Sequence, residues 1–511
     1  MALHPAPQGR LRVLAVMSLT LLAALAHGSE PPDNPSGPAP ASQQDADAAS
    51  ADAKALRLEI RQQEERLREL ERRLEADEAA QRAAAGANGA PAISPAASPN
   101  ALLGSVGEDG IRLQSADGLN VVHLGGNVSV DYRYFNDSFD APTADTWLVR
   151  KARLILEGQL NGMFDFRFMP DFGQGKSIIQ DAWLDVRAAP WLVFTAGKFK
   201  APVGLERLQL EQFARFIEAS LTADLEPYRD LGGEIGGSLG GLVNYQIGAF
   251  DGAPDGGSTD GNSIPDANSS GKLTWNARVF ALPFKRTSWR VLQGWGLGLA
   301  GTYVNDSGVA TTSATTSLLA SYKTTGQQPM FSYRGNTSAI LNNATIARGI
   351  ERRLVPQSYW YYGRVYVMGE YVEEARQVFR QVSSASSRAA TLEHSAWQIQ
   401  GGVFVTGEKE AYDAGAPMHE VGKGGLGAWE IVARYHGLRY DGDTFSAGSA
   451  SFANPATAVR SARAAGIGLN WYLTRFFKVQ LDFEVTRFEG GALLGDRPDE
   501  RVLTSQFALT L

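Results

Sequence analysis

From Leu119 to the C-terminus, apolar and polar side chains alternate along the chain with a period of two residues. In the first such stretch, Val128 and Val130 alternate with the polar Ser129 and Asp131. Successive side chains of a β-strand point to opposite faces, so the pattern predicts strands that have one apolar and one polar face. The alternation recurs in many later segments, which predicts an all-β domain that extends to the last residue.

The length and the ends of these segments distinguish a membrane barrel from a soluble sandwich. Sandwich strands are shorter and turn their apolar face inward, whereas membrane strands need about nine to eleven residues and carry aromatic residues at both interfaces. Here aromatic residues such as Tyr134, Trp191 and Trp471 lie near the ends of alternating segments. We therefore predict an outer-membrane β-barrel over residues 119–511, with apolar side chains toward lipid and polar side chains toward the interior.

The length of this region sets the number of strands. Porin strands with their turns and loops use roughly two dozen residues each, which predicts a transmembrane barrel of about 16 antiparallel strands. A barrel of that width is not filled by its own side chains and leaves an aqueous channel. Charged residues of both signs on the predicted inner face suit a wet interior, because unpaired charges are unstable in lipid.

The N-terminus has the three parts of an export signal. The bases Arg10 and Arg12 come first, followed by an apolar run over residues 11–25 and small residues that end at Ala26. We predict a cleaved signal peptide over residues 1–26, which exports the protein, and with the predicted barrel this indicates the outer membrane of a Gram-negative bacterium. The N-terminal segment that remains is then expected in the periplasm.

Between the signal and the barrel, the sequence predicts one helix and two linkers. Residues 27–50 are rich in Pro, Ser, Ala and Asp and are typical of a flexible linker. Residues 51–82 have the heptad spacing of a short α-helical coiled coil, with the seam positions Ala53, Leu56, Ile60, Leu67, Leu70 and Leu74. A lone charged helix is the alternative, but so short a helix is marginal unless its leucines are buried. Residues 83–118 contain several Gly and Pro and are predicted to be a second linker.

Composition excludes several classes of function. The chain has no cysteine, so it has no disulfide and no thiolate metal site. Its formal charge of −7 does not favour nucleic-acid binding. The histidines lie near no Gly-x-Ser-x-Gly motif, and the glycine-rich stretches lack the Lys-Ser/Thr ending of a phosphate loop. We therefore predict neither an enzyme nor a cofactor.

Two polar segments, residues 252–271 and 304–353, are predicted to be extracellular loops. Oxygen ligands for calcium are present in and beside the first of them, at Asp251, Asp255, Asp260 and Asp266. Their scatter among glycines is also typical of a flexible loop, which we favour, so we predict no metal site.

A run of unusual specificity, Gly-Lys-Phe-Lys-Ala-Pro-Val-Gly-Leu-Glu-Arg-Leu, occupies residues 197–208. It follows Phe-Met-Pro-Asp-Phe at residues 168–172 and Asp-Ala-Trp at residues 181–183. In these motifs, and in its order of signal, coiled coil and barrel, the chain resembles the phosphate- and polyphosphate-selective porins of Gram-negative bacteria, the porin O and P type. The resemblance implies a sixteen-stranded, homotrimeric, anion-selective pore. It also implies that a long loop, here about residues 200–230, folds into the lumen and narrows it.

The resemblance implies that arginines and lysines of this loop bind phosphate. The constriction candidates are Lys198, Lys200, Arg207, Arg215 and Arg229. Guanidinium groups suit the task because their fixed donors pair with phosphate oxygens and never lose their charge. On nearby strands, bases with lumen parity are predicted to form the approach, namely Arg133, Lys151, Arg153 and Arg167.

These residues predict a porin for passive diffusion of small anions such as phosphate or polyphosphate, with outer-membrane lipid as its surroundings. Two alternatives remain open. The same loop holds the acidic residues Glu206, Glu211, Glu218, Asp224, Glu226 and Asp230. Because bases and acids nearly balance over the barrel, a general or mixed-selectivity small-solute porin is the first alternative. The second is an envelope tether, in which the barrel is an anchor and the coiled coil contacts the cell wall from the periplasm.

Overall fold

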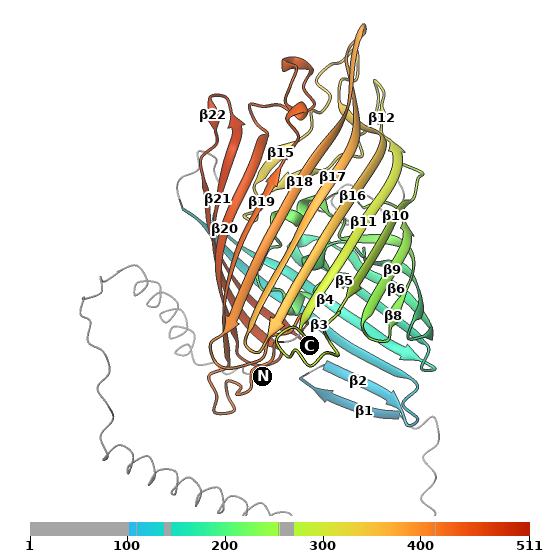
Figure 1. The fold of residues 1–511 in the computed structure, drawn as a ribbon, viewed down its shortest axis with the longest axis vertical. Helices are drawn as coiled ribbons and strands as arrows, with labels where there is room; N and C mark the ends of the chain where they lie inside the picture. Colours follow the sequence, from blue (N-terminus) through green and yellow to red (C-terminus); the bar gives the residue numbers. More distant parts are fainter. Residues whose placement is uncertain (1–101, 109, 137–144, 254, 256–269, 414) are drawn as a thin grey trace, which may run out of the picture. The chain divides into compact units, whose positions relative to one another are not determined.

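The computed structural model describes residues 102–108, 110–136, 145–253, 255, 270–413 and 415–511 (Figure 1). The chain divides into two compact units, Met1–Ser94 and Pro95–Leu511, and every described residue belongs to the second. The predicted signal peptide, first linker and coiled coil therefore lie outside the described residues. Within the described ranges, no helix is both long enough and apolar enough to cross a membrane.

Sixteen strands of the described region form a closed antiparallel barrel, which confirms the predicted architecture (Figure 1). Each strand pairs with its neighbours in chain order, and β23 pairs with β3 to close the ring. The barrel strands are β3 Val121–Phe135, β4 Thr146–Leu160, β5 Phe164–Asp171, β6 Ile178–Ala189, β7 Leu192–Lys200, β8 Arg229–Leu239, β9 Val243–Phe250, β10 Thr274–Ala281, β11 Trp295–Ser307, β16 Thr345–Tyr362, β17 Val365–Ser383, β18 Ser386–Phe404, β19 Ala428–Arg439, β20 Val459–Tyr472, β21 Phe477–Ala492 and β23 Glu500–Thr510.

The remaining described elements are short and lie in the connections or before the barrel. They are β1 Leu102–Gly107, β2 Gly110–Ser115, η1 Gly173–Gly175, α3 Leu205–Leu208, η2 Glu211–Phe213, η3 Leu221–Leu225, β12 Val309–Ala310, β13 Thr315–Thr316, β14 Ser321–Lys323, β15 Pro329–Ser332, η4 Gly442–Thr444, η5 Gly448–Ala450 and β22 Gly495–Asp496.

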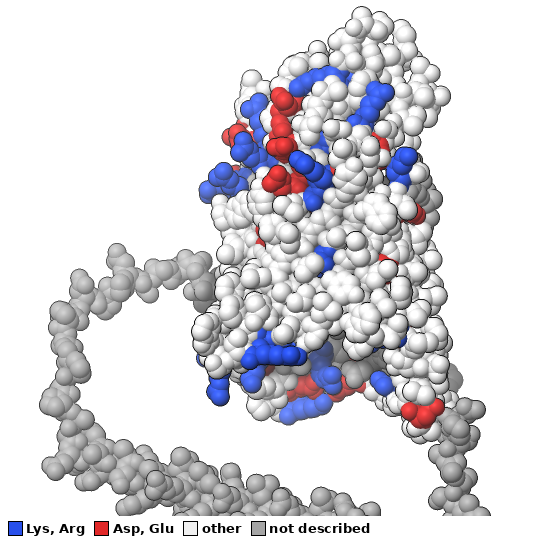
Figure 2. Space-filling model, turned by 45° about the vertical axis from the view of Figure 1, so that its right-hand side comes forward, with Lys and Arg blue, Asp and Glu red and all other residues white. Residues whose placement is uncertain are grey.

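The two faces of the wall follow the predicted alternation. On β3, Asn127 and Ser129 are buried inside the barrel, whereas Val128 and Tyr134 are exposed on its outside. This arrangement is the reverse of a soluble core, because lipid surrounds the apolar face and water wets the polar one. Figure 2 shows that most charged side chains on the face in view lie toward the two ends of the barrel, with few across its middle.

The residues at 102–115 differ from the prediction of a linker that extends to residue 118. β1 and β2 form a hairpin, and β2 continues the sheet by pairing with β3 from Ile111–Leu124 to Gln114–Val121. The alternation did not predict the hairpin, because glycines interrupt the pattern and each strand has only six residues. Pairing with an existing strand supplies the hydrogen bonds that so short a hairpin lacks by itself.

The connections at one end of the barrel are mostly short, such as residues 161–163 and 240–242, and the long ones gather at the other end. Residues 308–344 form a long connection that contains four short strands. The predicted loop over residues 304–353 was too long on both sides, because β11 extends to Ser307 and β16 begins at Thr345. Strand β16 has eighteen residues, so it continues well past the length needed to cross a membrane.

One part of the lumen is filled by the connections. Leu221 and Leu225 of η3 are fully buried and belong to one apolar cluster with Val355 of β16 and Val372 of β17. Tyr322 of β14 joins the same cluster. Burial of these side chains holds the connections inside the barrel rather than above it.

Candidate functional site

Residues 201–228, hereafter the inward loop, connect β7 to β8 and enter the lumen, as the family resemblance implied for about residues 200–230. The loop has its own apolar anchors, since Val203 and Leu205 are completely buried. A carboxylate of the barrel wall also binds the loop. Glu370 of β17 accepts hydrogen bonds from the backbone N–H groups of Leu205 (2.6 Å) and Glu206 (3.3 Å). Those N–H groups begin the one-turn helix α3 and have no partner within it.

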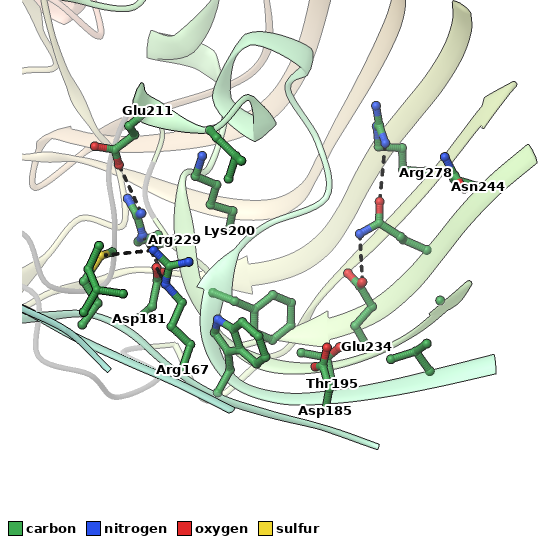
Figure 3. Close-up of a pocket in the computed structure, with 18 of the residues that line it drawn as sticks. Arg167, Asp181, Asp185, Thr195, Lys200, Glu211, Arg229, Glu234, Asn244 and Arg278 are labelled. Atoms are coloured by element: carbon green, nitrogen blue, oxygen red, sulfur yellow. Dashed lines mark hydrogen bonds and ion pairs between the residues drawn. The ribbon is translucent and has the colours of Figure 1, made fainter. Parts of the chain in front are cut away.

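Beside the inward loop, a cavity of about 540 Å³ lies along β4 to β10 (Figure 3). Five cationic side chains line it: Arg153, Arg167, Lys200, Arg229 and Arg278. Four carboxylates line it as well, namely Asp181, Asp185, Glu211 and Glu234. The cavity is therefore polar and contains both charges, and its character depends on how these groups are arranged.

Glu211 of the inward loop is the centre of the basic side of this cavity. Its carboxylate lies 2.8 Å from Lys151 Nζ, 2.6 Å from Arg153 Nη1 and 3.2 Å from Arg229 Nη2. The Tyr228 hydroxyl donates a further hydrogen bond of 2.6 Å. Burial alone raises the pKa of a carboxyl group, but the surrounding cations, Arg153 foremost, hold the pKa of Glu211 well below its usual range.

A second set of ion pairs follows the wall away from Glu211. Arg229 Nε donates to Asp181 at 2.7 Å, and Arg167 Nε lies 3.4 Å from the same carboxylate. Arg167 also lies 2.9 Å from Glu157. Figure 3 shows Arg167, Asp181 and Arg229 as one group, with Asp185 and Glu234 farther along the same strands β6 and β8. Bases thus gather on one side of the cavity and carboxylates predominate on the other.

Tyr228, the last residue of the inward loop, carries three cations against its ring. Arg229 and Arg207 stack at 4.5 and 4.6 Å from the ring centre, and Lys200 Nζ lies at 5.7 Å. Lys200 also donates to the carbonyl oxygen of Gln209 at 2.6 Å. Cation–π contacts lower the energy of bringing like charges together, so Tyr228 is the residue that assembles Lys200, Arg207 and Arg229.

Of the constriction candidates, the structure brings Lys200, Arg207 and Arg229 together and separates Lys198 and Arg215 from them. Arg215 is fully buried, 2.7 Å from Glu410 and 3.3 Å from Glu430. Lys198 is buried in the wall, where its register partners are Ala182 and Leu231. Strand ends and inward loops do not keep a period of two, so sequence parity could not distinguish these positions from Lys200.

The approach residues all have carboxylate partners inside the barrel. Arg133 of β3 lies 2.7 Å from Glu218 of the inward loop. Lys151 and Arg153 bind Glu211, and Arg153 also binds Asp171 at 2.7 Å. The predicted lumen side of these residues and of Arg167 agrees with the structure, and their pairing with the inward loop was beyond the reach of the sequence.

Arg150 was missed because a β-bulge changes the parity of β4. The register with β3 shifts between Ser129 and Val130, which leaves Arg150 as an extra residue in β4. As a result both Arg150 and Lys151 reach inward, where Arg150 lies 3.0 Å from Glu218. A bulge re-aims side chains without any strict signature in the sequence.

A second segment, residues 405–427, enters from the end of the short turns and supports the inward loop. The carbonyl oxygens of Ala411 and Tyr412 accept hydrogen bonds from Arg215 (3.0 Å) and Gln209 (2.5 Å). The Tyr412 hydroxyl donates to the carbonyl oxygen of Leu205. The inward loop is therefore held from both ends of the barrel, and this support had no counterpart in the sequence analysis.

One group of described carboxylates has the proximity of a metal site. Asp255, Glu351 and Glu374 have oxygen atoms within 4.8 Å of one another. Arg376 lies between them, 3.0 Å from Asp255 and 2.8 Å from Glu374, and Arg353 also contacts all three. The two guanidinium groups supply the positive charge that a cation would bring, so the group is an ion-pair network.

The sequence was compared with models of protein families, and residues 122–487 match the family described as phosphate-selective porin O and P. This match covers most of the chain and nearly the whole barrel. The chain belongs to the phosphate-selective porin O and P family. It is an outer-membrane porin channel, as the resemblance of residues 197–208 predicted, and family and fold indicate a channel rather than an enzyme.

Solved structures with a similar fold are outer-membrane proteins of low sequence identity. OmpT of Vibrio cholerae is 8% identical, over 77% of this chain and 98% of that one, with a TM-score of 0.46. The outer membrane channel DcaP of Acinetobacter baumannii is 11% identical, over 78% and 99%, with a TM-score of 0.46. Salmonella typhi OmpF is 10% identical, over 76% and 98%, with a TM-score of 0.44. A search of curated proteins finds no match to the sequence.

Proposed function

We propose that this porin conducts small anions, phosphate among them, by passive diffusion past the basic side of the cavity. The observation that carries the proposal is the convergence of Lys151, Arg153 and Arg229 on one carboxylate, that of Glu211, with Lys200 beside them. Cations outnumber carboxylates at this point of the lumen. The description of the family as phosphate-selective supports the choice of anion.

Glu211 has a specific role in this proposal. Its carboxylate occupies the donors of Arg153 and Arg229 when no ion is present, so an arriving phosphate exchanges with Glu211 instead of meeting bare cations. Exchange of one anionic partner for another keeps the net binding weak. Conduction needs such weak, successive sites, because a deep site holds the ion and blocks the flow.

A mixed-selectivity channel is the second candidate, and a different observation favours it. Asp185 and Glu234 line the same cavity on the side away from Glu211. Gln246 donates to Glu234 at 2.9 Å, and Arg278 extends the same group toward β10. In this candidate function, small cations pass along the side of the cavity that holds Asp185 and Glu234. The ion selectivity of the channel then depends on whether this side or the side of Glu211 is wider.

Single-channel recording in planar bilayers tests the proposal. Under a potassium chloride gradient, anion preference sets the sign of the reversal potential, and added phosphate is expected to reduce the chloride current at millimolar concentrations. Arg229→Gln and Lys200→Gln should move the reversal potential toward cations and weaken the phosphate effect. Lys285→Gln is the matched control, because Lys285 lies on an exposed turn and bonds only to the carbonyl oxygen of Gly241 in the described region.

Cation preference of the wild type, or variants that match Lys285→Gln, would rule out the phosphate assignment and leave a mixed-selectivity channel. Titration with sulfate provides the comparison for anion identity, since equal inhibition by both ions would show a general anion site.

We infer further that the porin works as a homotrimer with its N-terminal segment in the periplasm. The family resemblance and the heptads of residues 51–82 support this assembly, together with the domain boundaries predicted above. Deletion of residues 29–94, which spares the β1–β2 hairpin, should lower the temperature at which trimers dissociate and leave conductance unchanged. Loss of envelope attachment with an unchanged trimer would favour the tether instead.

A further inference from the structure

A second groove, separate from the cavity along β4 to β10, lies between outward side chains of the wall and the connection that follows β19. It runs over β18, β19 and β20 at the end where the long connections gather, and its volume is about 690 Å³. Three arginines line it, namely Arg439, Arg460 and Arg463, together with Trp397 and Glu489. The candidate channel site shares no lining residue with this groove, so the groove is a separate feature of the protein.

The strand pattern shows that two arginines of the groove lie on the outer face of the barrel wall. Arg439 is four residues from Tyr435 on β19, and Arg463 is four residues from Ile467 on β20, so each pair shares a face. Tyr435 and Ile467 are 45% and 55% exposed on the apolar outside of the wall. The two arginines therefore point outward just beyond the apolar band, at the level of lipid headgroups.

The register places a further cation, Arg487, beside one of the arginines that line the groove. Arg463 of β20 lies directly opposite Arg487 of β21, and the side chains of directly opposed residues are roughly 5 Å apart at Cβ. Like charges in that position destabilise a sheet. Among the described residues, Arg487 has one ion-pair partner, Asp499 at 3.6 Å, and its side chain is 80% exposed.

Few groups of the described protein neutralise the charge of the other arginines. Within the described part of the chain, the side chains of Arg439 and Arg463 form no hydrogen bond or ion pair. Arg460 only approaches the ring of Phe445 at 6.0 Å. Glu489, the carboxylate of the groove, accepts a hydrogen bond from Ser461 at 3.0 Å. Arg439, Arg463 and Arg487 thus lie on the outer face of the wall with Arg460 beside them, and these four guanidinium groups outnumber the nearby carboxylates Glu489 and Asp499.

We propose that this groove binds the phosphorylated headgroup of a lipid of the outer leaflet. A phosphate between Arg463 and Arg487 relieves their repulsion and accepts forked hydrogen bonds from both. Arg439 and Arg460 reach the same ligand from the neighbouring positions. The acyl chains of such a lipid continue down the apolar wall past Tyr435 and Ile467, which a free phosphate ion has no means to use.

Binding of defined lipid to the full-length protein in detergent tests this site. The probe is diphosphoryl lipid A, and bound lipid is counted by native mass spectrometry after addition of known amounts. Arg463→Gln combined with Arg487→Gln should weaken binding about tenfold or more, since hydrogen bonds to charged groups are among the strongest. Arg439→Gln should weaken it less.

The matched control is Arg352→Gln on the outside of β16. Arg352 is exposed, and its register partners are Tyr303 and Ala375, neither of them a base. Conductance and the unfolding temperature of each variant confirm that the barrel is intact. Lipid binding by the double variant equal to that of the control would overturn the proposal.

Two further arms identify the source of the phosphate. Dephosphorylated lipid A should bind to the wild type as weakly as diphosphoryl lipid A binds to the double variant. Inorganic phosphate at millimolar concentration should not displace the diphosphoryl lipid. Displacement by inorganic phosphate would assign the groove to a soluble anion and overturn the lipid assignment.

Discussion

The Arg215 guanidinium of the inward loop lies 2.7 Å from the Glu410 carboxylate, and both side chains are fully buried. Glu410 belongs to residues 405–427, which enter the lumen from the opposite end of the barrel. This ion pair helps to join two connections that are far apart in sequence and approach from opposite membrane faces. With the bonds of Tyr412 to Gln209 and Leu205, it fixes the inward loop against residues 405–427.

Replacement of Arg215 by Leu is expected to destabilise the barrel. It leaves Glu410 and Glu430 buried without their cation, and loss of one partner of a buried pair costs about 3–5 kcal/mol. Urea unfolding in detergent measures the loss, and open-channel current noise should rise as the inward loop gains freedom. Arg364→Leu, on an exposed turn, is the control, and equal effects of both would disprove the junction.

Glu211→Gln is expected to make the channel more selective for anions. The substitution removes the charge of the carboxylate that Lys151, Arg153 and Arg229 share, but keeps its shape. The reversal potential under a chloride gradient should move toward the anion limit, and phosphate should dwell longer and inhibit at lower concentration. Glu373→Gln, on the exposed outside of β17, should change neither quantity.

The same residue predicts that the charge at this point of the lumen does not change between pH 8 and 5. Because the pKa of Glu211 lies well below its usual range, the group stays ionised as the pH falls from 8 to 5. Wild-type selectivity should then show no step in this range that Glu211→Gln abolishes. A step near pH 5 that disappears in the variant would contradict the proposed ion cluster.

Glu226 predicts the opposite behaviour. Its side chain is fully buried in the inward loop, and both carboxylate oxygens lack a hydrogen-bond partner among the described residues. Burial, with Glu370 nearby, raises its pKa well above the usual range. The folded protein therefore retains a proton that the unfolded chain releases, so stability falls as the pH rises above the unfolded pKa, by up to about 1.4 kcal/mol per pH unit.

Glu226→Gln should remove that part of the pH dependence. In urea unfolding from pH 5 to 8, the free energy of unfolding of the variant is expected to rise relative to that of the wild type as the pH rises. Asp443→Asn, in η4 with a side chain that is 66% exposed, shows the size of an ordinary surface effect. Parallel curves for wild type and Glu226→Gln would contradict a neutral Glu226.

Two substitutions of Tyr228 distinguish the role of its ring from that of its hydroxyl group in holding Lys200, Arg207 and Arg229. Tyr228→Phe keeps the ring beneath Lys200, Arg207 and Arg229 and loses only the bond to Glu211. Tyr228→Leu also loses the cation–π contacts, each worth about 0.5–2 kcal/mol. The phosphate effect on conductance should therefore weaken more in Tyr228→Leu than in Tyr228→Phe, and equal losses would assign the role to the hydroxyl.

Several features of this protein were determined by the sequence alone. The alternation of residues such as Val128 and Ser129 specified the strands, their lipid and lumen faces and the approximate strand number. The run at residues 197–208 indicated the family and an inward loop of nearly the observed length. These are local properties, because the direction of a strand side chain follows from its own backbone and its neighbours in the chain.

Only the tertiary structure decided which charges meet. The bulge that turns Arg150 inward, the burial of Arg215 against Glu410 and the opposition of Arg463 and Arg487 all depend on strand register and on contacts across the lumen. Register is a relationship between two strands, and an ion pair joins residues that lie hundreds of positions apart once the barrel closes. A single sequence specifies the charges of the channel, whereas closure of the barrel decides which of them face water, protein or lipid.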